Sequence, residues 1–132
     1  MTARSGRNEQ LSIILSFLVG VAIPIVAHRV VQPLGLQFTW LPSIFAFVLF
    51  GAASYFLRSR LPSRSWAVAI LIFVGVPFGT IADALIDSGL FNRARNMVPF
   101  EIMSWWVVAL APVIAGCMLG GLRQAEARER TD

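Results

Sequence analysis

The chain contains no lysine, one cysteine and one histidine, and only 14% of its 132 residues are charged. In a soluble domain, about a quarter of all residues are usually charged. The single cysteine, Cys117, excludes an internal disulfide. The single histidine, His28, excludes histidine-rich metal sites and bis-histidine haem ligation within one chain. These shortages exclude several common classes of metalloprotein and disulfide-rich protein.

Four long stretches have no Asp, Glu, Lys or Arg at all, namely residues 10–28, 30–57, 65–82 and 102–122. Each has about the 17–25 mainly apolar residues that cross a roughly 30 Å hydrocarbon core. In lipid such a stretch must be helical, because its backbone groups have no water to bond. With 57% hydrophobic residues and a mean hydropathy of +0.72, the chain is predicted to be all-α. We expect one polytopic integral membrane domain, a bundle of four transmembrane helices.

The predicted spans are about 10–28, 39–57, 66–86 and 100–122, which leaves polar tails at 1–9 and 123–132. The first span could instead be a signal peptide, because Arg4 and Arg7 precede an apolar run. That run is long for such a signal, and the candidate cleavage site Ile25-Val26-Ala27 lacks a small residue at its first position. We therefore favour a retained first span.

Arginines are distributed unevenly between the two ends of the predicted helices. Eight of the eleven lie in the N-terminal tail, the middle loop 58–64 and the C-terminal tail, whereas Arg29, Arg93 and Arg95 lie on the other side. The positive-inside rule then places both termini in the cytoplasm. Arginine as the only strongly basic residue indicates a GC-rich bacterial genome, and hence a bacterial inner membrane. The net charge of +4 is explained by contact with the lipid bilayer, so we expect no nucleic-acid partner.

Small residues recur four apart on three of the predicted helices, a pattern that lets helices approach closely in lipid. These packing positions are Ser12, Ser16 and Gly20 on the first helix, Gly75 and Gly79 on the third, and Gly116 and Gly120 on the fourth. Together they provide more close-packing surface than one antiparallel bundle needs. We therefore expect a homo-oligomer or a partner membrane subunit.

The two halves of the chain resemble each other weakly. An offset of 55 aligns Gly20 with Gly75 and His28 with Asp83, and an offset of 65 aligns Gly51 with Gly116. The chain is then two repeated helical hairpins of the same orientation, as in transporters built from parallel repeats. The alternative is chance, since glycine and proline are common in membrane helices.

Asp83 and Asp87 lie four residues apart and share one face of the third helix. They fall at its C-terminal end, where the helix macrodipole disfavours anions. Compensating groups are expected on the same side of the membrane, and with the two acids they form the candidate polar cluster: His28, Arg29, Arg93, Arg95 and Glu101. The cluster is interpreted as a structural ion-pair network, as a site for a cation, proton or polar substrate, or as independent solvated side chains.

Enzyme motifs fit the chain poorly. There is no Walker motif and no nucleophile-elbow sequence. Two carboxylates could act as acid and base, or hold a divalent ion together with substrate phosphates, but a spacing of four is a weak signal. We predict no catalytic residue, resident metal or cofactor. The first functional hypothesis is a non-catalytic accessory, assembly or interaction subunit, followed by a small oligomeric transporter or channel subunit, and then by a membrane-embedded enzyme acting on a lipid or phosphate group.

Overall fold

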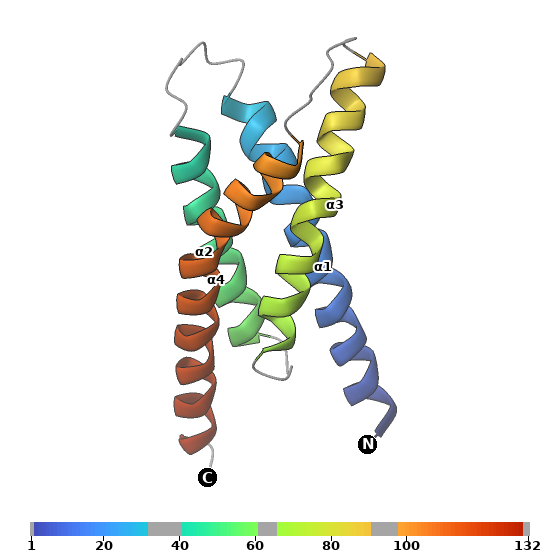
Figure 1. Ribbon diagram of the computed structural model, residues 1–132. Coiled ribbons are helices and arrows are strands. Elements are labelled where there is room, and N and C mark those ends of the chain that lie inside the picture. Colours follow the sequence, from blue (N-terminus) through green and yellow to red (C-terminus); the bar gives the residue numbers. More distant parts are fainter. Residues whose placement is uncertain (1, 32–40, 61–65, 91–97, 131–132) are drawn as a thin grey trace.

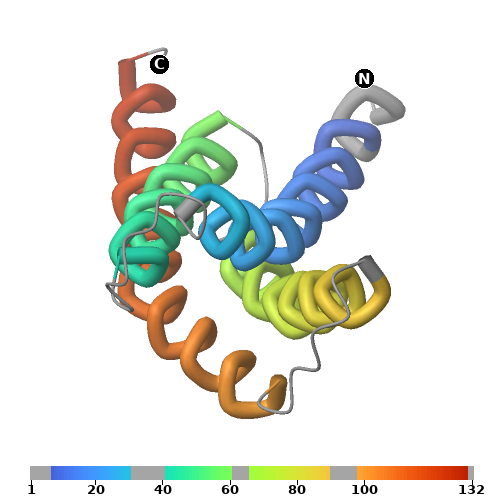
Figure 2. Tube along the Cα trace, turned by 90° about the horizontal axis from the view of Figure 1, so that it is seen from above, coloured from blue at the N-terminus to red at the C-terminus, as the bar shows by residue number. Residues whose placement is uncertain are grey.

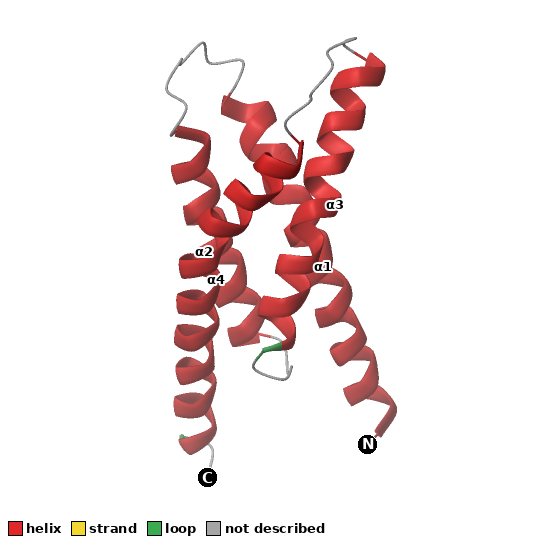
Figure 3. Cartoon of the chain, viewed as in Figure 1, coloured by secondary structure: helices red, strands yellow, loops and turns green. Residues whose placement is uncertain are grey.

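The computed structural model describes residues 2–31, 41–60, 66–90 and 98–130 (Figure 1). These residues form four helices, α1 (Thr2–Val31), α2 (Leu41–Arg60), α3 (Ala67–Leu90) and α4 (Val98–Glu129). All four are long and apolar enough to cross a membrane. The predicted all-helical architecture with four candidate spans is thereby confirmed for the described part of the chain (Figure 3).

The helices extend beyond the predicted hydrophobic spans. Helix α1 begins at Thr2, inside the predicted N-terminal tail, and α4 continues to Glu129, through most of the predicted C-terminal tail. Helix α3 runs on to Leu90, beyond the predicted span of 66–86. Hydropathy marks only the part of a helix that matches the apolar core, whereas backbone hydrogen bonds continue into polar sequence.

Alternate helices along the chain pack most closely, α1 against α3 and α2 against α4. Each pair runs parallel, since the sequence colours rise in the same direction along both members (Figure 1). The view from above shows the two pairs side by side (Figure 2). Both chain termini lie at one end of the molecule, and the ends of α1 and α3 lie at the opposite end with the start of α4 (Figure 1).

Glycine forms the seam between α1 and α3. A Cβ atom at Gly75 would lie 2.5 Å from the Phe17 carbonyl oxygen and 2.9 Å from the Gly20 Cα. A Cβ at Gly20 would overlap the Ile72 carbonyl oxygen, and one at Gly79 would overlap that of Val21. The two backbones are in direct contact, which is the close approach that small residues permit in lipid.

The seam between α2 and α4 is built in the same way. A Cβ at Gly116 would lie 2.5 Å from the Gly51 carbonyl oxygen, and one at Gly120 would lie 2.8 Å from that of Tyr55. Ser54 is fully buried here and donates to the Phe50 carbonyl of its own helix at 2.7 Å. Ser12 and Ser16 are likewise buried on α1, and the Ser16 hydroxyl donates to the Ser12 carbonyl. Small residues therefore line both seams, while many bulky apolar side chains face outward.

Pro77 lies inside α3 and leaves one backbone carbonyl without its helical partner. Proline has no N–H, so the residue four positions earlier, Phe73, loses the hydrogen bond its carbonyl would normally accept. The indole Nε1–H of Trp106 on α4 donates to this Phe73 carbonyl at 2.9 Å. A side chain of one helix thus satisfies a carbonyl freed in another, and this bond links the two helix pairs near the middle of α3.

Trp106→Phe is expected to lower the free energy of unfolding by about 1 kcal/mol, because the freed Phe73 carbonyl would lose its donor. The measurement is SDS-induced unfolding of the detergent-solubilised protein followed by circular dichroism. Pro77→Ala restores the N–H, so in that background Trp106→Phe should cost almost nothing. Equal costs in the two backgrounds would show that the indole acts only through packing.

Candidate functional site

Helix α3 places Asp83 and Asp87 one turn apart on the face that meets α1. Both are buried, with 3% and 6% of the residue exposed. Thr80 lies one turn earlier, also buried, and its hydroxyl donates to the Val76 carbonyl at 3.0 Å. A buried carboxylate is costly without charged hydrogen-bond partners. The position of the two acids therefore requires cations from a neighbouring helix.

Arg29, in the last turn of α1, supplies the main compensation. Its Nε donates to Asp83 Oδ1 at 2.9 Å, and its Nη2 donates to Asp87 Oδ1 at 2.7 Å. The same Nη2 also approaches the Asp83 backbone carbonyl at 3.3 Å. One guanidinium thus bridges both carboxylates and the helix backbone, which is the forked geometry that distinguishes arginine from lysine.

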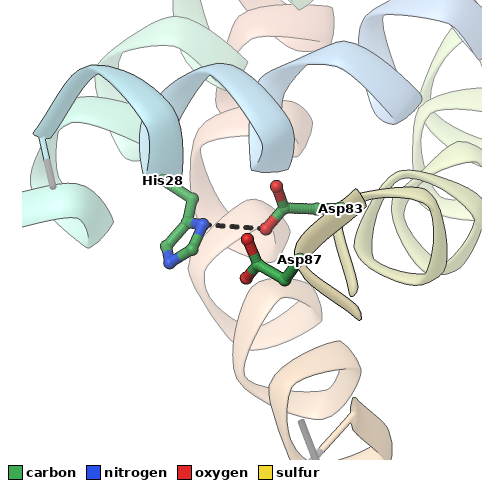
Figure 4. A group of neighbouring side chains, drawn as sticks. All are labelled: His28, Asp83 and Asp87. Atoms are coloured by element: carbon green, nitrogen blue, oxygen red, sulfur yellow. Dashed lines mark ion pairs between the residues drawn. The ribbon is translucent and has the colours of Figure 1, made fainter. Parts of the chain in front are cut away.

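His28 contacts the cluster from the neighbouring position on α1. Its Nδ1 lies 2.8 Å from Asp83 Oδ2, on the opposite oxygen from the one that Arg29 binds. Figure 4 shows His28, Asp83 and Asp87 converging from α1 and α3. The Nδ1 atom is buried and lies close to Asp83 without an aligned hydrogen bond. One ligand atom from each of the three side chains lies within 4.8 Å of the others.

The helix ends explain why this cluster is stable as a unit. Cations suit the C-terminal end of α1, whereas anions are disfavoured at the C-terminal end of α3. Arg29, at the C-terminal end of α1, donates to both carboxylates at the C-terminal end of α3 and so offsets their unfavourable position. Two of the predicted cluster members on α1 thus contact the acids of α3: Arg29 contacts Asp83 and Asp87, and His28 contacts Asp83.

The other predicted members of the cluster are Glu101, Arg93 and Arg95. Glu101 stands half-buried in the first turn of α4, at the same end of the molecule as the cluster (Figure 1). Arg93 and Arg95 lie outside the described residues. The described cluster thus joins α1 and α3, and Glu101 approaches that end from the other helix pair.

Sequence reasoning missed a second polar group, at the opposite end of the molecule. Arg58 Nη1 donates to Gln124 Oε1 with a short contact, and Arg123 Nη1 donates to the Tyr55 hydroxyl at 2.7 Å. Both bonds link α2 to α4. The sequence alignment with an offset of 65 already related α2 to α4. Only the parallel packing of the two helices shows that these polar side chains meet.

Comparisons of the chain with models of protein families, with curated proteins and with solved structures found no match.

Proposed function

We propose that this chain is a non-catalytic membrane protein that works by associating with another transmembrane protein, and that its first partner is a second copy of itself. The observation that carries this proposal is an apolar groove between α2 and α4, of about 430 Å³. Five of its lining residues are small: Gly51, Ala52, Ala111, Ala115 and Gly116. Small residues are the surface on which transmembrane helices associate.

The lining of the groove combines small residues with exposed bulky apolar ones. Phe47 and Leu119 both line it and are exposed. Around a two-fold axis each copy would present the same small and bulky residues to the other, as isologous interfaces require. Gly51 and Gly116 also belong to the seam between α2 and α4, so the groove continues an existing close-packed surface.

The polar cluster supports a non-catalytic role. An acid or base must be placed to exchange a proton with a substrate. Asp83 and Asp87 are buried, and both accept hydrogen bonds from Arg29. Their described contacts hold α1 against α3, so these charged groups stabilise the packing of the two helices.

Self-association is tested by single-molecule photobleaching in vesicles at low protein density. We expect two-step bleaching for the wild type and single-step bleaching for Ala52→Phe, which fills the groove from an exposed position. The matched control is Val107→Phe, which adds similar bulk at an exposed site outside the groove. Single-step bleaching of the wild type would refute self-association, and equal effects of both variants would place the interface elsewhere.

A cation-linked transporter is the second candidate, favoured by the convergence of His28, Asp83 and Asp87. The buried His28 Nδ1 without an aligned hydrogen bond suits a cation shared with the carboxylates. In this case Zn²⁺ or Mn²⁺ would raise the thermal stability of the wild type, and Asp87→Asn would abolish the increase.

The proposed setting is a bacterial inner membrane with both termini in the cytoplasm. Helix α2, with Arg58 and Arg60 in its last turn, ends toward the end of the molecule that carries both termini (Figure 1). Arg123 of α4 donates to Tyr55 of α2. An excess of arginine favours the cytoplasmic side. The cluster of Asp83, Asp87 and Arg29 then lies toward the outer face. Cysteine accessibility at each end tests this orientation.

We further propose that the chain arose from two helical hairpins. The offset of 55 makes Gly75 the equivalent of Gly20, and Asp83 that of His28. Both pairs are in contact across α1 and α3. Equivalent residues of two parallel helices meet when the helices are related by a two-fold axis between them, which supports duplication.

A further inference from the structure

We propose that a groove beside Arg58 binds an anionic phospholipid, with the phosphate on the guanidinium and an acyl chain along the apolar wall. This Arg58 groove has a volume of about 370 Å³ and is lined by Arg58, Trp66 and side chains of α4. It is separate from the self-association groove, which Phe47, Ala52 and Ala115 help to line. The lipid proposal and the self-association proposal can therefore be tested independently.

The wall of the groove suits an acyl chain. Ile114, Cys117, Met118 and Leu122 line it along α4, and Met118 and Leu122 are well exposed. Trp66, at the start of α3, borders the groove and is 61% exposed. Tryptophan is typical of the level of lipid headgroups. The groove thus runs from the level of the headgroups into the apolar part of the molecule.

Arg58 gives the groove its charge. Its Nη1 donates to Gln124, but its buried Nε has no hydrogen-bond partner among the described residues. No carboxylate in the described part of the chain forms an ion pair with it. A buried donor without a partner is costly, and a guanidinium binds phosphate oxygens especially well. A phosphate oxygen is therefore the acceptor that this group lacks.

Gly121 leaves open space beside the guanidinium. Gly116 and Gly120 are required by the seam, since a Cβ at either would strike α2. A Cβ at Gly121 would have only Arg58 Nε and Nη2 within 4 Å, both at 3.8 Å, so it meets no backbone of a neighbouring helix. Packing does not explain glycine here. A larger side chain at this position would fill the groove beside Arg58.

The surrounding charges favour an anionic ligand. Arg60 and Arg123 lie at the same end of the molecule, and neither forms an ion pair with a described carboxylate. Glu126 and Glu129 follow on α4, but both are exposed. If this end faces the cytoplasm, it also faces the leaflet in which anionic lipids are concentrated.

The experiment is native mass spectrometry of the full chain in detergent, titrated separately with phosphatidylglycerol, phosphatidylcholine and inorganic phosphate. We expect one phosphatidylglycerol to bind at least about tenfold more tightly than phosphatidylcholine, because only the first carries net negative charge. Arg58→Gln should reduce phosphatidylglycerol binding about tenfold. Gly121→Leu should reduce it as strongly with the charge unchanged.

Arg60→Gln and Gly121→Ala are the matched controls, and both should bind phosphatidylglycerol within about twofold of the wild type. Equal loss in Arg58→Gln and Arg60→Gln would overturn the site in favour of diffuse surface charge. Equal binding of the two lipids would overturn the role of the phosphate charge, and inorganic phosphate bound as tightly as phosphatidylglycerol would overturn the role of the acyl chain. Unchanged binding in Gly121→Leu would also reject the groove.

Discussion

Arg29→Met is expected to lower the free energy of unfolding by about 3–5 kcal/mol, because removing one partner of a buried ion cluster leaves uncompensated charge. Methionine keeps most of the length of the side chain but removes the donors that reach Asp83 Oδ1 and Asp87 Oδ1. Both carboxylates are buried between α1 and α3. The measurement is the SDS unfolding midpoint and slope of the detergent-solubilised protein, followed by circular dichroism.

Two controls separate charge from shape in this prediction. Arg29→Lys keeps the charge but not the fork, so it should lose less than Arg29→Met and should not reach wild-type stability. Combining Arg29→Met with Asp83→Asn and Asp87→Asn removes the stranded charges and should recover most of the loss. A loss below about 1 kcal/mol for Arg29→Met would mean that the cluster behaves as an exposed ion pair.

The same series also distinguishes the two candidate functions. If the cluster is purely structural, divalent cations should leave the stability of the wild type unchanged. If His28, Asp83 and Asp87 form a cation site, Arg29→Met should be rescued by Zn²⁺ or Mn²⁺, because the metal would replace the guanidinium between the carboxylates. Rescue without any effect on the wild type would show that arginine normally excludes the cation.

Gly75→Ala and Gly79→Ala are each expected to lower the free energy of unfolding by about 1–3 kcal/mol. The added methyl group would strike the backbone of α1, at Phe17 for the first variant and at Val21 for the second. The backbone cannot move aside as a flexible side chain can, so α1 and α3 must separate. SDS unfolding followed by circular dichroism measures the loss.

Gly89→Ala is the matched control for these variants, since it makes the same substitution in the same helix with nothing within 4 Å of the new methyl group. It should be neutral or slightly stabilising, because alanine favours helix over glycine. If Gly75→Ala and Gly79→Ala changed the free energy of unfolding as little as Gly89→Ala does, the close contact between α1 and α3 would be wrong.

The cluster shows how far sequence reasoning reached. The spacing of Asp83 and Asp87 predicted a shared face and a need for cations, and the short list of charged residues on that side included Arg29 and His28. Which cation binds which oxygen could not be predicted, because that depends on the rotation of α1 relative to α3. Trp106 illustrates the same limit: Pro77 predicts an unsatisfied carbonyl at Phe73, but nothing local identifies the donor.

The sequence by itself determined the helical class, the number of candidate spans and the small residues suited to close packing. Those properties are local, since a helix satisfies its own backbone and hydropathy depends only on composition. Only the tertiary structure decided that α1 pairs with α3 and α2 with α4, because the choice of partner depends on which faces fit across the whole chain. That pairing brings Arg29 to Asp83 and Asp87, and it places Gly121 beside Arg58.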